Sequence, residues 1–310
     1  MQLTQTGSKN LARLACALAG GIWGIVWIPL RALDNAGIPG AWATSVLHLI
    51  PALILFPLIL LRFNKIKAAG VPLQAIGSSL GISMMLYSTA LLYTDVIHAV
   101  LLYYLTPIWG ALLAKVWLKE PISNNRIIGI VLGLSGMLVI LNIDQGFPVP
   151  RNIGDWMALA AGIFWAVAAN LLRRYPNYQA LDITSTWFYW CSGFSVIVAY
   201  VTHPHVGPET VDAVLNVSIW VLPFALLVLM PIYFIAAWGT PKLNPGASGI
   251  LYMTEISVGA ISATLLTNEP FGMREILGVG LITAAGLTEF VAPILAATFP
   301  ASRRRRSREH

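Results

Sequence analysis

Charged residues are scarce in this sequence of 310 residues, since Asp, Glu, Lys and Arg together make up only 10% of it. A typical soluble domain is roughly 25% charged, so the chain has too few charges to cover a water-soluble fold. Only two cysteines occur, Cys16 and Cys191. Both fall in apolar segments, which argues against a disulfide framework or a cysteine-based metal site. Motifs for nucleotide binding, zinc proteolysis and nucleophilic catalysis are also lacking.

Long apolar runs are present instead. Hydrophobic residues make up 57% of the chain, and its mean hydropathy is +0.74. A helix of roughly 20 apolar residues crosses a bilayer core about 30 Å thick. Ten such segments can be drawn, which predicts an all-α integral membrane protein with ten transmembrane helices. The predicted spans are 11–30, 40–61, 71–93, 96–117, 126–142, 154–172, 181–201, 214–238, 246–267 and 274–296.

Basic residues are distributed unevenly between the two sides of the predicted membrane. When the connections are assigned alternately to two sides, sixteen of the 19 Lys and Arg residues fall on the side of the N-terminus. Short cytoplasmic segments are enriched in Lys and Arg, so both termini are predicted to lie in the cytoplasm. The basic residues of the tail, 303–308, are then expected to contact anionic lipid of the bilayer and not nucleic acid.

An internal repeat relates the two halves of the chain. The stretch 100–140 overlays 249–289 without a gap, and Tyr103 then falls on Tyr252. Five spans in each half reverse the orientation of the second half relative to the first. Inverted repeats of this kind are typical of secondary transporters, whose substrate site lies near the middle of the membrane between the halves.

The repeat predicts how the chain is divided. Residues 1–10 form a short polar lead, and 11–147 form the first five-helix unit. Residues 148–297 form the second unit, and 298–310 form the basic tail. Both units are expected to contribute to one central cavity.

Two motifs in the first half resemble a known family. Residues 104–107 read Tyr-Leu-Thr-Pro in the predicted fourth helix, and 118–121 read Leu-Lys-Glu-Pro in the turn after it. With the five-plus-five layout, they resemble the drug/metabolite transporter superfamily, and most closely its bacterial branch built from two EamA repeats. The resemblance implies a bacterial inner-membrane protein that moves small metabolites, such as amino acids, through a central cavity. The second half has Glu255 and Ile256 in place of the Thr-Pro pair, so the two helices need not behave alike.

Glu255 is the residue to which the sequence points most directly. It lies in the middle of the predicted span 246–267, where an ionised side chain costs roughly 2.5–3.5 kcal/mol to insert. Its side chain is therefore expected to face the interior of the bundle. Two interpretations stay open, namely a site for proton coupling or a substrate amine, and a structural carboxylate paired to a nearby hydroxyl or backbone group. Tyr252 lies three residues earlier, on the same helical face.

The other candidates are mostly aromatic or lie at a predicted helix break. Pro107 kinks its helix and frees a carbonyl near Tyr103, as in helices that line cavities. Trp23 and Trp165 lie in mid-span. They match each other in a second, weaker repeat, which relates 20–31 to 162–173. Tryptophan usually prefers the membrane interfaces, so cavity lining and core packing are both considered. The predicted substrate-binding or coupling residues are Glu255, Tyr252, Tyr103, Tyr104, Thr106, Pro107, Trp23, Trp27, Trp165, Tyr87 and His98.

The sequence predicts no catalytic residue, cofactor or metal. His203 and His205 share one outer loop, but their spacing with nearby acidic residues is too loose to predict a site. Glycines 129, 133 and 136 indicate close helix packing, within the chain or in a homodimer. The leading hypothesis is a secondary transporter that exports small organic metabolites by alternating access, with possible proton coupling. The alternatives are a membrane-embedded enzyme and a ligand-binding sensor.

Overall fold

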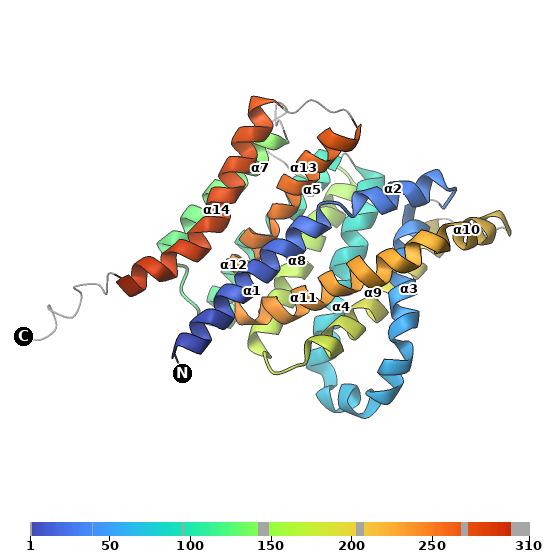
Figure 1. Cartoon of the computed structure of the whole chain (residues 1–310), viewed down its shortest axis with the longest axis horizontal. Coiled ribbons are helices and arrows are strands. Elements are labelled where there is room, and N and C mark those ends of the chain that lie inside the picture. Colours follow the sequence, from blue (N-terminus) through green and yellow to red (C-terminus); the bar gives the residue numbers. More distant parts are fainter. Residues whose placement is uncertain are drawn as a thin grey trace, which may run out of the picture.

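The computed structural model describes residues 2–38, 40–94, 96–141, 149–202, 208–267 and 272–298. Within these ranges every regular element is helical, which confirms the predicted all-α class (Figure 1). The elements are α1 (Gln2–Trp23), α2 (Trp27–Asn35), α3 (Gly40–Leu61), α4 (Phe63–Tyr93), α5 (Val96–Tyr103), α6 (Thr106–Trp117), α7 (Asn124–Ile140), α8 (Ile153–Arg174), α9 (Ala180–Thr202), α10 (Pro208–Phe224), η1 (Ala225–Leu229), α11 (Met230–Gly239), η2 (Thr240–Lys242), α12 (Pro245–Tyr252), α13 (Thr254–Thr267) and α14 (Met273–Thr298). His203, His205 and the basic tail lie outside the described residues.

Seven helical stretches are long and apolar enough to cross a membrane, so the chain is a multi-pass membrane protein. They are Gly7–Asn35, Ala41–Leu61, Phe63–Leu91, His98–Trp117, Ile153–Arg174, Val211–Lys242 and Pro245–Leu266. α7 is apolar but has only 17 residues. α9 and α14 have 23 and 26 residues and are not among these seven stretches. Each stretch corresponds to one predicted span, while the count of ten crossings stays a prediction.

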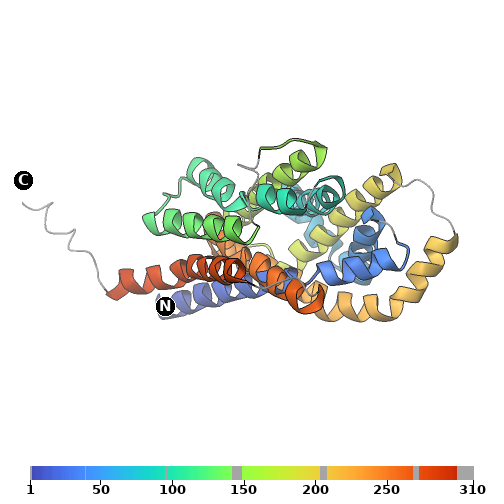
Figure 2. The ribbon, with the colours of Figure 1, turned by 90° about the horizontal axis from the view of Figure 1, so that it is seen from above.

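The helices α7 and α14, which end the two predicted halves, pack side by side (Figures 1 and 2). They run antiparallel, because Gly136 lies against Gly278 near the start of α14, whereas Gly129 lies against Thr288 near its end. A Cβ atom on Gly278 would overlap the side chain of Ile140. The predicted glycine packing therefore occurs within the chain, and a homodimer stays a prediction.

The predicted fourth and ninth spans are each broken in the middle. α5 ends at Tyr103 and α6 begins at Thr106, whereas α12 ends at Tyr252 and α13 begins at Thr254. The two tyrosines match each other in the internal repeat, so both breaks fall at the same position of it. The two helices therefore break alike, although only the first has a proline beside its break, Pro107.

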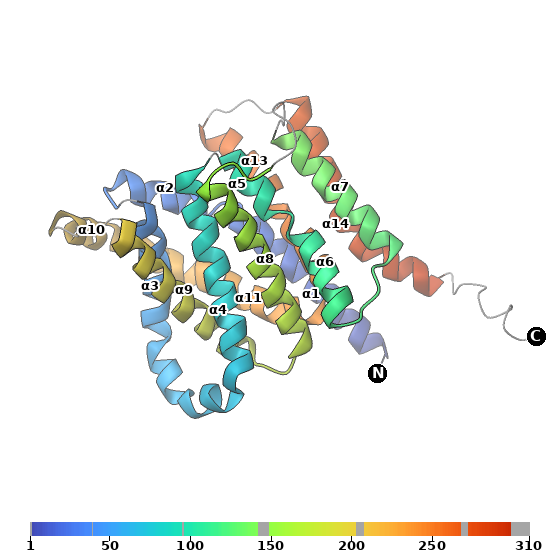
Figure 3. The same ribbon diagram turned by 180° about the vertical axis from the view of Figure 1, so that it is seen from behind.

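One glycine contact is built in the same way at both breaks. A Cβ atom on Gly20 of α1 would lie 2.8 Å from the carbonyl oxygen of Tyr252, and one on Gly162 of α8 would lie 2.5 Å from that of Tyr103. These distances leave no room for a side chain. The two glycines match each other in the weaker repeat, so equivalent helices of the two halves approach equivalent breaks. This close approach positions the candidate site. On its other side, α8 packs along α4 (Figure 3).

Candidate functional site

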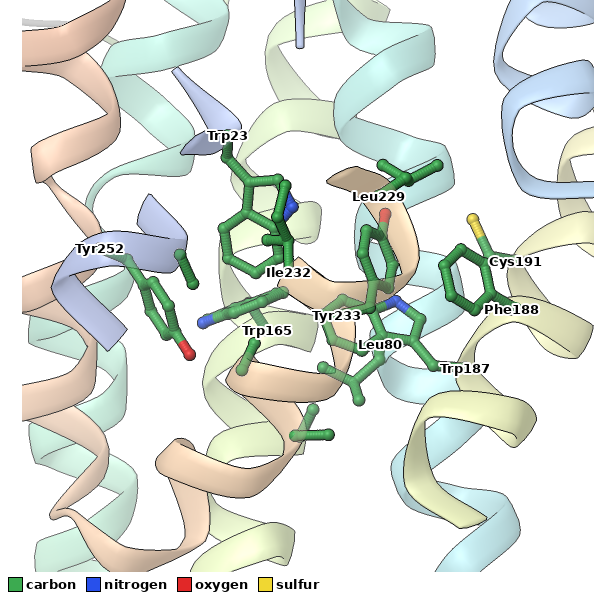
Figure 4. Packing of buried hydrophobic residues seen from close by; sticks show 14 of the residues in the cluster. Trp23, Leu80, Trp165, Trp187, Phe188, Cys191, Leu229, Ile232, Tyr233 and Tyr252 are labelled. Atoms are coloured by element: carbon green, nitrogen blue, oxygen red, sulfur yellow. The ribbon is translucent and has the colours of Figure 1, made fainter. Parts of the chain in front are cut away.

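Aromatic rings from both predicted halves meet in the interior of the bundle (Figure 4). Trp23 of α1 and Trp165 of α8 contact each other edge to face, with ring centroids 5.4 Å apart. The ring of Tyr252, at the end of α12, lies 5.2 Å from Trp23 and 5.4 Å from Trp165, centroid to centroid. Trp23 and Trp165 are 9% and 4% exposed. The two repeat-related tryptophans thus face each other where the halves meet.

Two further aromatic side chains extend this cluster. Trp187 of α9 and Tyr233 of α11 lie 6.0 Å and 5.8 Å from Trp23, centroid to centroid, and 4.2 Å from each other. Trp187 is absent from the residues that the sequence predicts for the site. Trp187 lies inside the predicted span 181–201. A tryptophan inside a span is the feature that identifies Trp23 and Trp165, so the same feature could have identified Trp187.

A small pocket lies beside the aromatic cluster, and its free space of about 10 Å³ is close to that of one water molecule. Sites for drug-sized ligands typically measure about 300–1,000 Å³, so the described conformation is closed around a small volume. The residues that line the pocket are Trp23, Tyr103, Tyr104, Thr106, Trp165, Gly249, Tyr252 and Glu255. The sequence predicts all of these as site residues except Gly249. The lining comes from α1, α5, α6, α8, α12 and α13, and therefore from both predicted halves.

Among the described residues, Glu255 is the only acid that lines this pocket. Its carboxylate accepts a hydrogen bond from the hydroxyl of Tyr104 across the interface between the halves. None of the ion pairs among the described residues includes Glu255. A carboxylate offers about four acceptor positions, so one hydroxyl leaves most of its capacity unused. The group can therefore hold a proton or accept hydrogen bonds from a ligand.

The wall opposite Glu255 is formed at the break between α5 and α6. The ring of Tyr103 contacts that of Tyr104 edge to face, with centroids 5.0 Å apart. Pro107 lacks the N–H that would bond to the carbonyl of Tyr103. The hydroxyl of Thr106 donates to that carbonyl oxygen over 2.5 Å and replaces the missing bond. The break is thus locally satisfied and leaves aromatic faces beside the pocket.

Two of the predicted site residues stand behind the lining and support it. The ring of Tyr87 stacks on that of Tyr103, with centroids 4.2 Å apart. Pro107 packs against Gly249, where an added Cβ atom would lie 3.0 Å from the Cα atom of the proline. Both residues therefore position the wall of the pocket without lining it.

Two other predicted site residues, Trp27 and His98, lie away from this pocket. Trp27 lies beyond the break that separates α1 from α2, and its Nε1 donates to the hydroxyl of Ser262 over 3.0 Å. The sequence predicts one continuous helix over 11–30, which would place Trp27 one turn after Trp23. His98 lies near the start of α5, where its Nδ1 is 3.4 Å from a carboxylate oxygen of Asp155.

A polar network joins both halves on the side where α1 begins and α14 ends, and we call it the Asn244 network. Arg126 donates from Nε to Glu289 over 2.9 Å and also donates to the side chain of Asn244. Asn244 donates to Glu120 over 2.5 Å, and Arg173 donates to the other oxygen of Glu120 over 2.9 Å. Asn244 also caps the N-terminus of α12. The network therefore connects α7, α8 and α14 to the helix that carries Tyr252 into the pocket.

Comparison with known proteins supports the resemblance predicted from the sequence. Residues 10–142 match the EamA-like transporter family. The uncharacterized transporter YvbV of Bacillus subtilis (strain 168) is 23% identical over 292 residues, which cover 89% of this chain and 90% of that protein. The uncharacterized transporter YyaM of the same strain is 22% identical over 212 residues, which cover 65% of this chain and 68% of that protein.

A solved structure extends the likeness to the whole fold. A crystal structure superposes with a TM-score of 0.70 at 18% sequence identity, and the match covers 95% of this chain and 99% of that chain. At this identity the match shows the fold alone. The predicted likeness to EamA-domain proteins is confirmed, and residues 10–142 form an EamA-like transporter domain.

Proposed function

We propose, from the premise that residues 10–142 form an EamA-like transporter domain, that the whole chain is a secondary transporter of small organic metabolites. The observation that carries the proposal is the pocket, which is lined by both halves and contains a single carboxylate among its described residues. Intramembrane ionisable groups typically mark substrate or ion pathways. Transport leaves the substrate chemically unchanged, in keeping with the absence of catalytic motifs from the sequence.

Alternating access is the mechanism that this arrangement favours. The walls of the pocket belong to helices of one half that contact helices of the other, as with α6 and α12. Rocking one half against the other would separate Trp23 from Trp165 and open the pocket to one side of the membrane at a time. The breaks after Tyr103 and Tyr252 would let the inner ends of these helices move separately from their outer ends.

The finer assignment is export of amino-acid-like metabolites from the bacterial cytoplasm across the inner membrane, with both termini cytoplasmic. The aromatic faces would contact the apolar part of such a substrate, and Glu255 would bind its amine. Proton coupling follows if substrate and proton compete for the same carboxylate. Protonation of Glu255 would release the amine, and its deprotonation would allow the next molecule to bind.

Replacing Glu255 with glutamine tests this mechanism, since Gln keeps the size of the side chain but cannot exchange a proton. In proteoliposomes with an imposed pH gradient, we expect uphill substrate movement by E255Q to fall below about a tenth of the wild-type rate. A typical coupling free energy of 1–3 kcal/mol between two bound ligands changes affinity by about 5–150-fold, and the expected loss of flux lies in this range. The measurement is radiolabelled flux together with the fluorescence of a pH-sensitive dye trapped inside.

The matched control is Glu275→Gln at the start of α14, where the carboxylate accepts a hydrogen bond from Gly272 N outside the pocket. Flux through this variant should remain at the wild-type rate. Wild-type flux and unchanged pH dependence in E255Q would remove Glu255 from the mechanism. Substrate binding by folded wild-type protein without any flux would instead favour the sensor over the transporter.

A further inference from the structure

We infer that the described conformation is closed at the end of the bundle where α1 begins and α14 ends, and that opening this end exchanges one helix contact for its repeat-related counterpart. The contact that breaks is α6 against α12, and the contact that forms is α13 against α5. The inference rests on the proposed alternating access and deepens it, because it names the closed end and the residues that decide which end opens. It is carried by an unequal contact between equivalent helices.

The internal repeat pairs the four short helices around the pocket. The shift that overlays 100–140 on 249–289 moves α5 onto the bounds of α12, and it moves α6 onto α13 to within one residue at each end. Contacts with the neighbouring long helices match as well, since α8 packs on α5 and α6 while α1 packs on α12 and α13. The two broken helices are therefore equivalent in their bounds and in these neighbours.

The contact between the two broken helices is not equivalent at the two ends of the bundle. α6 packs closely on α12, where a Cβ atom on Gly110 would lie 3.1 Å from the carbonyl oxygen of Pro245. The matching contact would join α13 to α5, but these two helices do not pack along each other in the described part of the chain. Gly259, which matches Gly110 in the repeat, has room for a side chain. A Cβ atom there would lie 3.6 Å from its nearest neighbour, the carbonyl oxygen of Gly24.

The Asn244 network holds the same end of the bundle closed. Each of its side-chain hydrogen bonds joins a residue of the first predicted half to a residue of the second. Arg126 also packs on the first turn of α12, because a Cβ atom on Gly246 would lie 3.0 Å from the Cδ atom of the arginine. Polar contacts and close backbone packing therefore act together at this end.

The repeat also predicts the conformation in which the opposite end is closed. Inverted repeats are related by a two-fold axis in the membrane plane, so the two halves can exchange conformations. In the exchanged state α13 packs on α5, and Gly259 has the position at the contact that Gly110 has in the described state. Each glycine is then at a close contact in one state only. A methyl group on Gly110 strains the described state, whereas a methyl group on Gly259 strains the exchanged state.

The experiment measures from which side of the membrane a thiol in the pocket can be reached. Thr106→Cys, in the full-length chain without its two native cysteines, supplies that thiol. A membrane-impermeant maleimide is applied to right-side-out and to inverted vesicles, and an N-terminal tag identifies the side on which α1 begins. The readout is the rate of labelling from that side divided by the rate from the other side. This ratio cancels any change in the reactivity of the thiol itself.

The two glycine variants should shift this ratio in opposite directions. We expect Gly110→Ala to raise it by about fivefold, because the added methyl group overpacks the contact with α12, and Gly259→Ala to lower it by a similar factor. Gly193→Ala in α9 is the matched control, since its Cβ atom meets nothing within 4 Å and its gain in helix propensity is the same. The ratio in this control should stay unchanged. G259A alone decides the question if G110A does not fold, because its methyl group fits the described state.

The outcomes separate this inference from the proposed function. A ratio that is unchanged in both variants, or that moves in the same direction in both, would overturn the exchange of contacts. If the thiol is still labelled from both sides in that case, alternating access stands without this exchange. Labelling from one side only, in the otherwise unchanged chain and in both variants alike, would contradict the proposed alternating access itself.

Discussion

Replacing Gly278 with valine is expected to prevent α14 from packing on α7 and to destabilise the protein by about 3 kcal/mol or more. A Cβ atom at this position would overlap the side chain of Ile140 and would lie 2.7 Å from the carbonyl oxygen of Gly136. The isoleucine side chain can rotate, but the backbone carbonyl cannot move without shifting α7. The two helices would have to separate, and their antiparallel contact holds the ends of both halves together.

Gly280→Val in the same helix is the matched control. A Cβ atom on Gly280 meets nothing within 4 Å, while the change in helix propensity is the same at both positions. Thermal unfolding in detergent, followed by the loss of the monodisperse peak on size exclusion, measures the difference. If both variants unfold at the same temperature, the close contact between α7 and α14 contributes nothing to stability.

Arg126→Ala is expected to destabilise the protein by about 3 kcal/mol, because it leaves two polar partners without their donor. Arg126 and Glu289 have only 13% and 10% of their side chains exposed. Breaking a buried pair by removing one partner costs about 3–5 kcal/mol, and partial exposure places this pair at the lower end. Asn244 also loses a hydrogen bond, which weakens the cap of α12.

A second substitution tests whether the buried charge is the cause. The double variant R126Q/E289Q removes both charges, so it should recover part of the stability lost in R126Q alone, and a double-mutant cycle measures that coupling. Lys65→Ala removes an exposed cation and should have little effect. Additive effects of the two single substitutions would show that Arg126 and Glu289 are not energetically coupled.

The sequence predicts the membrane architecture well because the signals are long and repeated. Apolar runs identify the helical stretches, and the internal repeat places Tyr103 and Tyr252 at equivalent helix breaks. The unusual positions of Trp23, Trp165 and Glu255 in mid-span also identify three of the residues that line the pocket. Each of these signals arises from the cost of placing a polar or aromatic group away from its usual depth in the membrane.

Features that depend on tertiary contacts leave weaker signals. The break after Tyr252 has no proline, and the hydroxyl of Thr254 there donates to the carbonyl oxygens of Leu251 and Ala17. Threonine is too common in helices for this role to be predicted. The Asn244 network likewise joins residues that lie far apart in the sequence, so no local motif indicates it.

In alternating access the pocket opens to each side of the membrane in turn, and the accessibility of Thr106 tests this most directly. Thr106 lines the pocket and is only 4% exposed in the closed conformation. Cys16→Ala and Cys191→Ala first remove the two native thiols. Thr106→Cys is then exposed to a membrane-impermeant maleimide in right-side-out and in inverted vesicles. Ser185→Cys, at a position that is 2% exposed and lies outside the pocket lining, serves as the unreactive control.

We expect the T106C thiol to react from both sides, and a transported substrate to slow the reaction from each side. Reaction from one side only, or from neither, would contradict alternating access through this pocket.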